Sequence, residues 1–331
     1  MNENFEKSYQ AQDCFEKKLV TTEPLSSTHK SGIIISPTID DFLTKDFLTE
    51  NLSKINSLLS ENGAILLRGF KVSGPDEFRN VVEATKESLL NYTHRSTPRK
   101  IISEGVFSST EYPEEQSIPQ HNEMSYTLSW PKKIFFYCYI KPTERGQTPI
   151  ANSKKVYQRL PKDLIERFEK RGVMYVRNYG HGIDLSWQDV FQTNDRLKVE
   201  SYCFENNIQF EWLDEKHLRT KQVCQASIRD TISGEGIWFN QAHLFHISNL
   251  PKDIENYLRR QYSEDQLPRN ALLGDGSPIT IEDLNLIRSA YKEEEIVFDW
   301  EENDILILDN ETMSHGRCPF RGPRSILVSM T

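Results

Sequence analysis

Residues 117–126, SIPQHNEMSY, hold His121 and Glu123 two positions apart in a segment without helical periodicity. Pro119, just upstream, suits the entrance of a β-strand rather than its centre. In a strand, side chains at i and i+2 project from the same face, so His121 and Glu123 can both reach one ion while Asn122 points away. A single His-x-Glu is more often a pair of solvated polar residues than half of a metal site. Whether His121 and Glu123 bind a metal ion therefore depends on a third ligand elsewhere in the chain.

His315 is the best candidate for that ligand. It follows the apolar run Ile305–Leu308, which predicts a buried strand, and a turn-rich link then leads into the apolar run 325–330. Two imidazoles and one carboxylate in this order are typical of a facial triad, which holds Fe(II) and leaves three coordination positions open. Zinc accepts the same ligands, so the ligand set alone leaves a zinc hydrolase open as an alternative.

A cation near the triad would allow a carboxylate-bearing cosubstrate to bind beside the metal. Arg324 lies nine residues beyond His315, at the start of the predicted strand SILVSM (325–330), and suits a bidentate carboxylate clamp. Thr148, in RGQTPIANS, offers a hydroxyl donor from a loop that leads into another strand. Arg317 and Arg321 are rivals for the role of Arg324, although each is equally well explained as a surface arginine.

Composition excludes several other classes of protein. The 331 residues carry 40 Lys and Arg against 49 Asp and Glu, a net charge of −9, which disfavours a nucleic-acid partner. The N-terminal segment resembles no secretory signal, and no apolar run approaches the roughly 18 residues of a membrane span, so we expect a cytoplasmic protein without a membrane partner. Five widely spaced cysteines without a CxxC motif favour reduced thiols over a disulfide scaffold or zinc finger.

Strand-like runs separated by Pro, Gly, Asn and Asp predict a β-rich body with helices outside it. Residues 1–30 are polar and predict an N-terminal extension, and 31–331 predict a single domain with a long insert at about 160–290. Helices are expected over 40–60, 74–90, 159–171 and 251–261. Strands are expected over 31–37, 64–70, 133–140, 172–180, 236–241, 295–300, 304–310 and 325–330.

Three segments together resemble the taurine dioxygenase-like (TauD/TfdA) family of Fe(II)/2-oxoglutarate oxygenases, over roughly residues 60–331. They are residues 109–161, beginning STEYPEEQSIPQHNEMSY, then GIWFNQAHLFHIS (236–248) and HGRCPFRGPRSILVSM (315–330). The likeness is greatest to the branch that contains the syringomycin-pathway aspartyl hydroxylase. It implies a mainly β fold with flanking helices, a double-stranded β-helix (jelly roll) of the clavaminate synthase-like type. Many relatives have two glycines before the threonine matched by Thr148, whereas Arg145 takes the first place here, which should be tolerable in a loop.

The resemblance also implies the cofactors and their ligands. Fe(II) would be held by His121, Glu123 and His315, and 2-oxoglutarate by Thr148 and Arg324, with O₂ as the oxidant. Related halogenases lack the carboxylate ligand, so Glu123 favours hydroxylation of an unactivated C–H bond. Desaturation or cyclisation, and a non-catalytic jelly roll that only binds a ligand, remain alternatives.

The substrate predicted for this branch is an amino acid or amino-acid-derived small molecule, free or tethered to a peptidyl carrier protein, in specialised-metabolite biosynthesis such as antibiotic biosynthesis. The candidate substrate-binding residues are Asn122, Arg99, Asn240 and Arg317. His243 and His246 are not expected to bind iron, because their spacing suits a helix and the triad is complete without them. His181 is expected in a loop, and a homo-oligomer is possible in this family.

Overall fold

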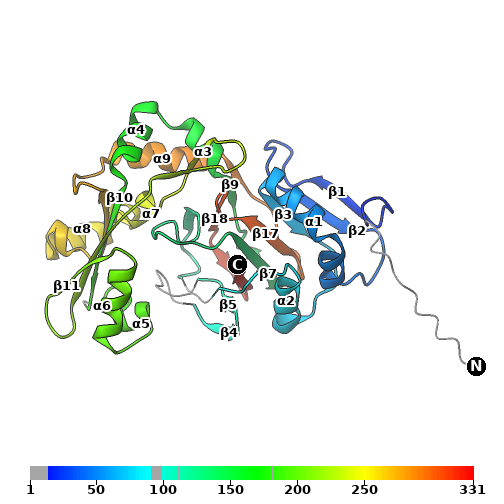
Figure 1. Cartoon of the computed structure of the whole chain (residues 1–331), viewed down its shortest axis with the longest axis horizontal. Coiled ribbons are helices and arrows are strands. Elements are labelled where there is room, and N and C mark those ends of the chain that lie inside the picture. Colours follow the sequence, from blue (N-terminus) through cyan, green and yellow to red (C-terminus); the bar gives the residue numbers. More distant parts are fainter. Residues whose placement is uncertain (1–13, 91–98, 111, 181) are drawn as a thin grey trace, which may run out of the picture.

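An eight-stranded sheet forms the centre of the protein in the computed structural model, which describes residues 14–90, 99–110, 112–180 and 182–331 (Figure 1). Only β2 and β3 pair in parallel; the other neighbours in this sheet are antiparallel. In spatial order the strands are β1 (Val20–Pro24), β2 (Ile33–Pro37), β3 (Ala64–Leu67), β17 (Ile305–Asp309), β7 (Lys133–Ile140), β20 (Ser325–Met330), β5 (Val106–Ser108) and β4 (Ile101–Ser103).

A smaller antiparallel sheet packs against the first and completes the jelly roll. Its strands, in order, are β16 (Glu295–Ile296), β9 (Ile150–Asn152), β18 (Met313–Arg317) and β6 (Ile118–His121). Strand β7 shows why residues 134–138 of the run KIFFYCYI are all apolar. Phe136 and Cys138 belong to the core shared with the small sheet, while Phe135 and Tyr137 belong to the core beneath the helices. Both faces of β7 are therefore buried over residues 134–138, and the predicted fold class is confirmed.

Helices α1 (Thr44–Asn62) and α2 (Gly74–Glu83) cover the outer face of the large sheet. Phe47, Ile55 and Leu59 recur at helical spacing and form the buried stripe of α1. The predicted Asn-Gly break ends this helix at Gly63, which has a left-handed φ of 75° and donates its N–H to Leu59. A Cβ at Gly63 would lie 2.7 Å from Met313, so only glycine fits this close approach to the small sheet.

Between β9 and β16 the chain leaves the jelly roll and builds a second body, in the region where the sequence predicts an insert (Figure 1). Its four-stranded antiparallel sheet has the order β11 (Gln209–Trp212), β12 (Leu218–Cys224), β10 (Val173–Tyr179) and β15 (Arg269–Leu273). Around it lie the hairpin β13 (Ser227–Arg229)–β14 (Gly236–Trp238) and helices α3 (Ser153–Arg159), α4 (Lys162–Arg171), α5 (Trp187–Phe191), α6 (Arg196–Glu205), α7 (Ala242–Phe245), α8 (Lys252–Gln261) and α9 (Ile281–Glu293).

Several predicted boundaries differ from the structure. Residues 20–24 fall within the predicted N-terminal extension but pair with β2 as an edge strand, so this part of the extension is packed on the sheet. The helix predicted over 74–90 ends at Glu83, and α9 was not predicted. Arg145, which was expected in a loop, ends the short strand β8 (Glu144–Arg145) with a left-handed φ of 59°, a conformation that costs roughly 1 kcal/mol for a residue other than glycine. Across the described residues, no helix combines the length and apolarity needed to cross a membrane.

Candidate metal centre and active-site pocket

Antiparallel pairing of β18 with β6 brings the three predicted metal ligands together. His315 and His121 are directly opposite each other in this pair, and their ring centroids lie 4.4 Å apart. Glu123 Oε2 lies 3.8 Å from His315 Nε2. One nitrogen or oxygen atom from each of the three side chains lies within 4.8 Å of the others, so a single metal ion can contact all three.

Glu123 reaches this site by a route that the sequence did not predict. Strand β6 ends at His121, and Glu123 lies in the turn that follows, so strand alternation does not aim its side chain. Asn310, at the end of β17, holds the turn instead. Its Oδ1 accepts the backbone N–H of Glu123 at 2.7 Å, and its Nδ2 donates to the carbonyl oxygens of Glu123 at 3.0 Å and Pro131 at 2.8 Å.

The Asn310→Ala variant is expected to bind iron more weakly and to lose about 2–4 kcal/mol of unfolding free energy, because buried backbone groups lose their hydrogen-bond partners. Iron titration and urea denaturation would measure the two effects. Asn56→Ala is the matched control, since in the described structure the Asn56 side chain accepts a hydrogen bond from the ammonium of Lys133 and bonds no backbone group. If Asn310→Ala bound iron as tightly as the wild type, the turn would be shown to keep Glu123 in place without the Asn310 side chain.

Both histidines present neutral imidazoles to the site. Nδ1 of His121 lies 2.9 Å from the carbonyl oxygen of Pro119, so Nδ1 carries the proton and Nε2 keeps its lone pair. Burial lowers the pKa of His121, although the carboxylate of Glu123 opposes this shift. Burial, together with the nearby His121 and Arg99, holds the pKa of His315 well below its ordinary value. Two neutral imidazoles and one carboxylate fit a divalent iron ion.

Arg99 pairs with the carboxylate of the predicted ligand set. Its Nη2 lies 2.6 Å from Glu123 Oε2, and the two side chains are only 4% and 3% exposed. Two cavities adjoin the metal site: an inner one that Thr148 and Arg324 line, and an outer one on the side of the second body. Arg99, which was predicted to bind substrate, lines both of them. Its charge compensates the buried Glu123 in the described structure.

The inner cavity contains the predicted cosubstrate-binding residues next to the histidines. Arg324 precedes β20, and Thr148 precedes β9; the pair β8 (Glu144–Arg145)–β19 (Phe320–Arg321) joins their two loops. The guanidinium of Arg324 donates to Gly146 O at 3.0 Å and lies 3.5 Å from Thr148 Oγ1. Trp300 Nε1 donates to the same hydroxyl at 3.1 Å. Apolar side chains complete the wall: Ile118, Phe136, Ile326 and Val328.

Arg324 is the best placed of the three candidate arginines. Burial, with a smaller contribution from Arg317, lowers the pKa of Arg324 to about 10, so it remains a cation at neutral pH. Arg317 also lines the inner cavity, but its guanidinium donates to three carbonyl oxygens, and the Arg321 side chain is 84% exposed. The three acceptors of Arg317 are Tyr112, Pro113 and Gln116. A cavity in which the cation of Arg324 lies beside a hydroxyl, with apolar side chains around them, suits the distal carboxylate of 2-oxoglutarate.

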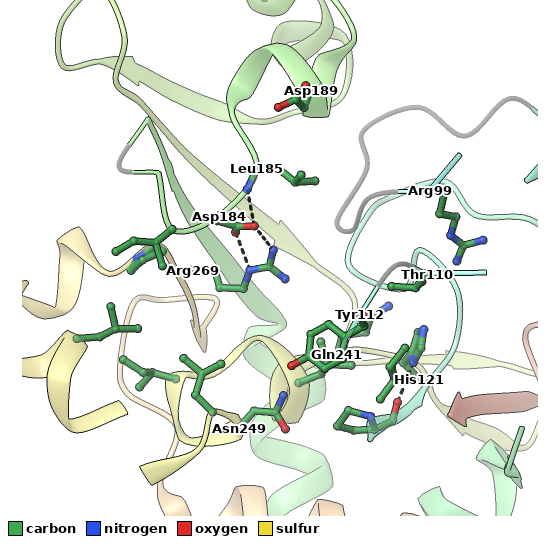
Figure 2. Close-up of a pocket in the computed structure, with 18 of the residues that line it drawn as sticks. Arg99, Thr110, Tyr112, His121, Asp184, Leu185, Asp189, Gln241, Asn249 and Arg269 are labelled. Atoms are coloured by element: carbon green, nitrogen blue, oxygen red, sulfur yellow. Dashed lines mark hydrogen bonds and ion pairs between the residues drawn. The ribbon is translucent and has the colours of Figure 1, made fainter. Parts of the chain in front are cut away.

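The outer cavity, of about 640 Å³, opens from the metal site toward the second body (Figure 2). This volume lies within the range typical of small-molecule sites. Gln241, from the loop before α7, also bonds the backbone of Asn122 at 2.9 Å and so ties this wall to the metal segment. Further lining residues come from distant segments: Thr110, Tyr112, Ile183, Asp184, Leu185, Asp189, Leu244, Ile247, Asn249, Leu250, Leu258 and Arg269.

Asn122 and Asn240 line neither of these two cavities. Asn122 is fully buried; its amide donates to Asn310 O at 2.7 Å, and its Oδ1 accepts from Ser153 at 3.1 Å. Asn240 is equally buried and donates to Ala226 O at 2.7 Å. Both side chains hold backbone segments around the site, and their positions do not support the predicted contact with substrate.

Two further histidines of the sequence analysis lie in the second body. His243, in α7, lies 2.8 Å from Gln120 O through Nε2, and burial lowers its pKa to about 3. His246 pairs through Nδ1 with Ser248. Neither belongs to the cluster of three ligands in the described structure, as expected. His181 lies outside the described residues.

The fold and the site together define an Fe(II)- and 2-oxoglutarate-dependent oxygenase, an oxidoreductase that uses O₂. A family model for the taurine catabolism dioxygenase TauD, TfdA family matches residues 22–331, and the chain belongs to this family.

Two curated relatives and one solved structure illustrate the likeness. The chain is 38% identical over 307 residues to the dapdiamide synthesis protein DdaC of Enterobacter agglomerans, with 93% of each protein covered. It is 31% identical over 286 residues to a clavaminate synthase-like protein of Arabidopsis thaliana, with 83% of each covered. The structure of PvcB from Pseudomonas aeruginosa matches with a TM-score of 0.56 and 15% identity, over 100% of this chain and 95% of PvcB. At that identity the structural likeness shows the fold alone.

Proposed function

We propose that the protein hydroxylates an unactivated C–H bond of an amino acid or amino-acid-derived small molecule in specialised metabolism. The observation that carries this proposal is the intact Glu123 carboxylate beside His121 and His315, at the inner end of a cavity large enough for such a substrate. Identity of 38% to a dapdiamide synthesis protein supports the metabolic context.

Each group of residues has a separate part in this reaction. His121, Glu123 and His315 would hold Fe(II), and Arg324 with Thr148 would hold the distal carboxylate of 2-oxoglutarate. When bound, iron and 2-oxoglutarate supply the oxidising power, since decarboxylation of the cosubstrate to succinate accompanies transfer of one oxygen atom of O₂ to the substrate. The protein's apolar walls keep water from the reacting carbon, and the outer cavity orients that carbon.

The carboxylate ligand favours hydroxylation over halogenation, because the position that a halide would need is taken by Glu123. Desaturation and cyclisation begin with removal of the same hydrogen atom and differ in the product. Mass spectrometry of the product separates them, since hydroxylation adds an oxygen atom whereas desaturation removes two hydrogens.

The test is succinate formation by purified protein with Fe(II), ascorbate and 2-oxoglutarate. Amino acids and their derivatives are supplied free and loaded on a peptidyl carrier protein. We expect succinate release that depends on iron and rises with at least one substrate, while Zn(II)-loaded protein releases none. Absence of succinate across both panels would contradict the proposal, and turnover by the zinc form would favour a hydrolase.

A further inference from the structure

Gln241 lies between the outer cavity and the metal centre (Figure 2). It lines the cavity and is only 2% exposed. Its Nε2 donates to the carbonyl oxygen of Asn122 at 2.9 Å, and Asn122 separates the metal ligands His121 and Glu123 in the chain. The Gln241 carboxamide is therefore one hydrogen bond away from the backbone that joins two of the ligands.

This hydrogen bond fixes the orientation of the Gln241 carboxamide. A flipped amide would place Oε1 against the carbonyl oxygen of Asn122, and two acceptors repel each other. The bond to Asn122 is the only one that the Gln241 side chain makes within the described structure, so Oε1 keeps both of its lone pairs. Holding the metal segment needs only Nε2, and this role leaves the acceptor Oε1 unexplained.

A second carboxamide lines the same cavity. Asn249 is the last residue of the 3₁₀ helix Ile247–Asn249, and its side chain makes no hydrogen bond to any described residue. Its amide nitrogen can donate, whereas Oε1 of Gln241 can only accept. Apolar side chains of the same segment also line the cavity: Leu244, Ile247 and Leu250. The wall therefore offers one acceptor and one donor among apolar groups.

A ligand that covers these two groups has to supply partners for them. Solvent can bond both carboxamides while the cavity is open, but a substrate that displaces the solvent leaves a buried acceptor unpaired unless it brings a donor. A site built to bond an N–H or O–H group discriminates strongly against an analogue that lacks it. Gln241 is thus placed to select substrates by a hydrogen-bond donor.

The carboxylates of the cavity are not placed to hold an ammonium group beside Gln241. An arginine already binds each of Glu123 and Asp184, at 2.6 and 2.8 Å. Asp189, on α5, lies at the far end of the cavity from Gln241 (Figure 2). A neutral group with one donor and one acceptor fits the two carboxamides better, and an amide has both.

We propose that Gln241 and Asn249 bind a carboxamide group of the substrate. Oε1 of Gln241 accepts its N–H, and the Asn249 amide donates to its C=O. The proposal rests on the proposed function and specifies its substrate class, an amino-acid derivative that contains a neutral amide. Because Gln241 bonds the backbone between two metal ligands, this amide lies on the side of the substrate that is oxidised.

N-Butylacetamide and 2-heptanone are suitable probes, because they differ only in an N–H group that CH₂ replaces. The protein is first loaded with Zn(II) and N-oxalylglycine, an unreactive analogue of 2-oxoglutarate, and both probes are titrated by saturation-transfer NMR. We expect the amide to bind at least about tenfold more tightly than the ketone. Equal affinities or a preference for the ketone would overturn the proposal, whereas failure of N-oxalylglycine to bind would count against the proposed function instead.

The Gln241→Met variant should reverse this preference, because the amide then gives up its hydration without gaining an acceptor. Gln225→Met is the matched control and should keep the wild-type ratio. Gln225 Nε2 donates to Ser125 O at 2.9 Å, in the turn that carries Glu123, but Gln225 does not line the outer cavity. A purely structural role of Gln241 would weaken both probes equally, and the unchanged ratio would refute the proposal.

The Asn249→Ala variant tests the carbonyl half of the site, and it suits the case in which Gln241→Met fails to fold by circular dichroism. The Asn249 side chain bonds no described residue, so its removal leaves the fold intact. Both probes carry a C=O, so both should bind about threefold more weakly or worse, at an unchanged ratio. Wild-type affinities for both probes would overturn the role of Asn249.

The pantetheine arm of a carrier protein also contains amides and offers the same chemistry. Pantetheine is therefore titrated as a third probe. Weaker binding than that of N-butylacetamide supports an amide in the substrate itself. Tighter binding that Gln241→Met abolishes would assign the site to the arm and overturn the proposed substrate class.

Discussion

The Glu123→Ala variant is expected to lose iron binding and hydroxylation, and to unfold more easily by about 3–5 kcal/mol. The metal loses its only carboxylate ligand among the three clustered side chains. The stability loss has a separate cause, because Arg99 Nη2 lies 2.6 Å from the removed carboxylate and both side chains are buried. Removing one partner of a buried ion pair is strongly destabilising, because the other charge loses its nearest compensating group.

A double variant separates these two effects. Arg99→Met in the Glu123→Ala background removes the buried cation that has lost its carboxylate partner, so most of the lost unfolding free energy should return while iron binding stays absent. Iron content after desalting and guanidinium denaturation measure the two quantities. Unchanged iron content and turnover in Glu123→Ala would remove Glu123 from the ligand set. Failure of the double variant to regain stability would show that the Arg99–Glu123 contact is not the cause.

The Arg324→Gln variant is expected to raise the KM for 2-oxoglutarate by about 100-fold or more. Arg324 is the cation of the inner cavity that lies beside Thr148, and loss of a buried charged partner typically costs about 2–5 kcal/mol of binding free energy. Iron affinity should change little, because Arg324 does not belong to the ligand cluster.

Arg321→Gln provides the matched control. It removes the same charge three residues earlier, but the Arg321 side chain is 84% exposed and lies 3.9 Å from Glu144. Succinate formation at graded 2-oxoglutarate concentrations gives the KM of each variant. Equal values for the two variants would assign the clamp to another residue, with Arg317 the next candidate because it also lines the inner cavity.

Much of the fold could be predicted from the sequence, because buried strands leave a strong pattern. The apolar runs at 64–67, 133–140, 305–309 and 325–330 form β3, β7, β17 and β20, the central strands of the large sheet. The pairing of His121 with His315 could be expected from the family pattern alone. These features depend on local sequence or on the arrangement of strands that the resemblance implies.

The rest depends on contacts that leave no local pattern. Asn310 holds the turn that carries Glu123, although 187 residues separate the two in the chain. Nothing in the sequence around either residue predicts this hydrogen bond. The ion pair between Asp184 and Arg269 depends on the antiparallel pairing of β10 with β15, which brings together segments about 85 residues apart in the chain. Asn122 and Asn240 are polar residues near the site, but both are buried and their side-chain amides donate hydrogen bonds to backbone carbonyl oxygens. Thr110 and Gln241 could be placed in the cavity only by the structure.

The position of β7 has a consequence for the order of events during protein synthesis. Its two neighbours in the sheet, β17 and β20, lie more than 160 residues later in the chain. While the ribosome makes the second body, both edges of this apolar strand lack their partners, and such edges favour aggregation. His315 and Arg324 emerge with the late strands. The nascent chain therefore cannot load iron, and metallation is a step that follows completion of the sheet.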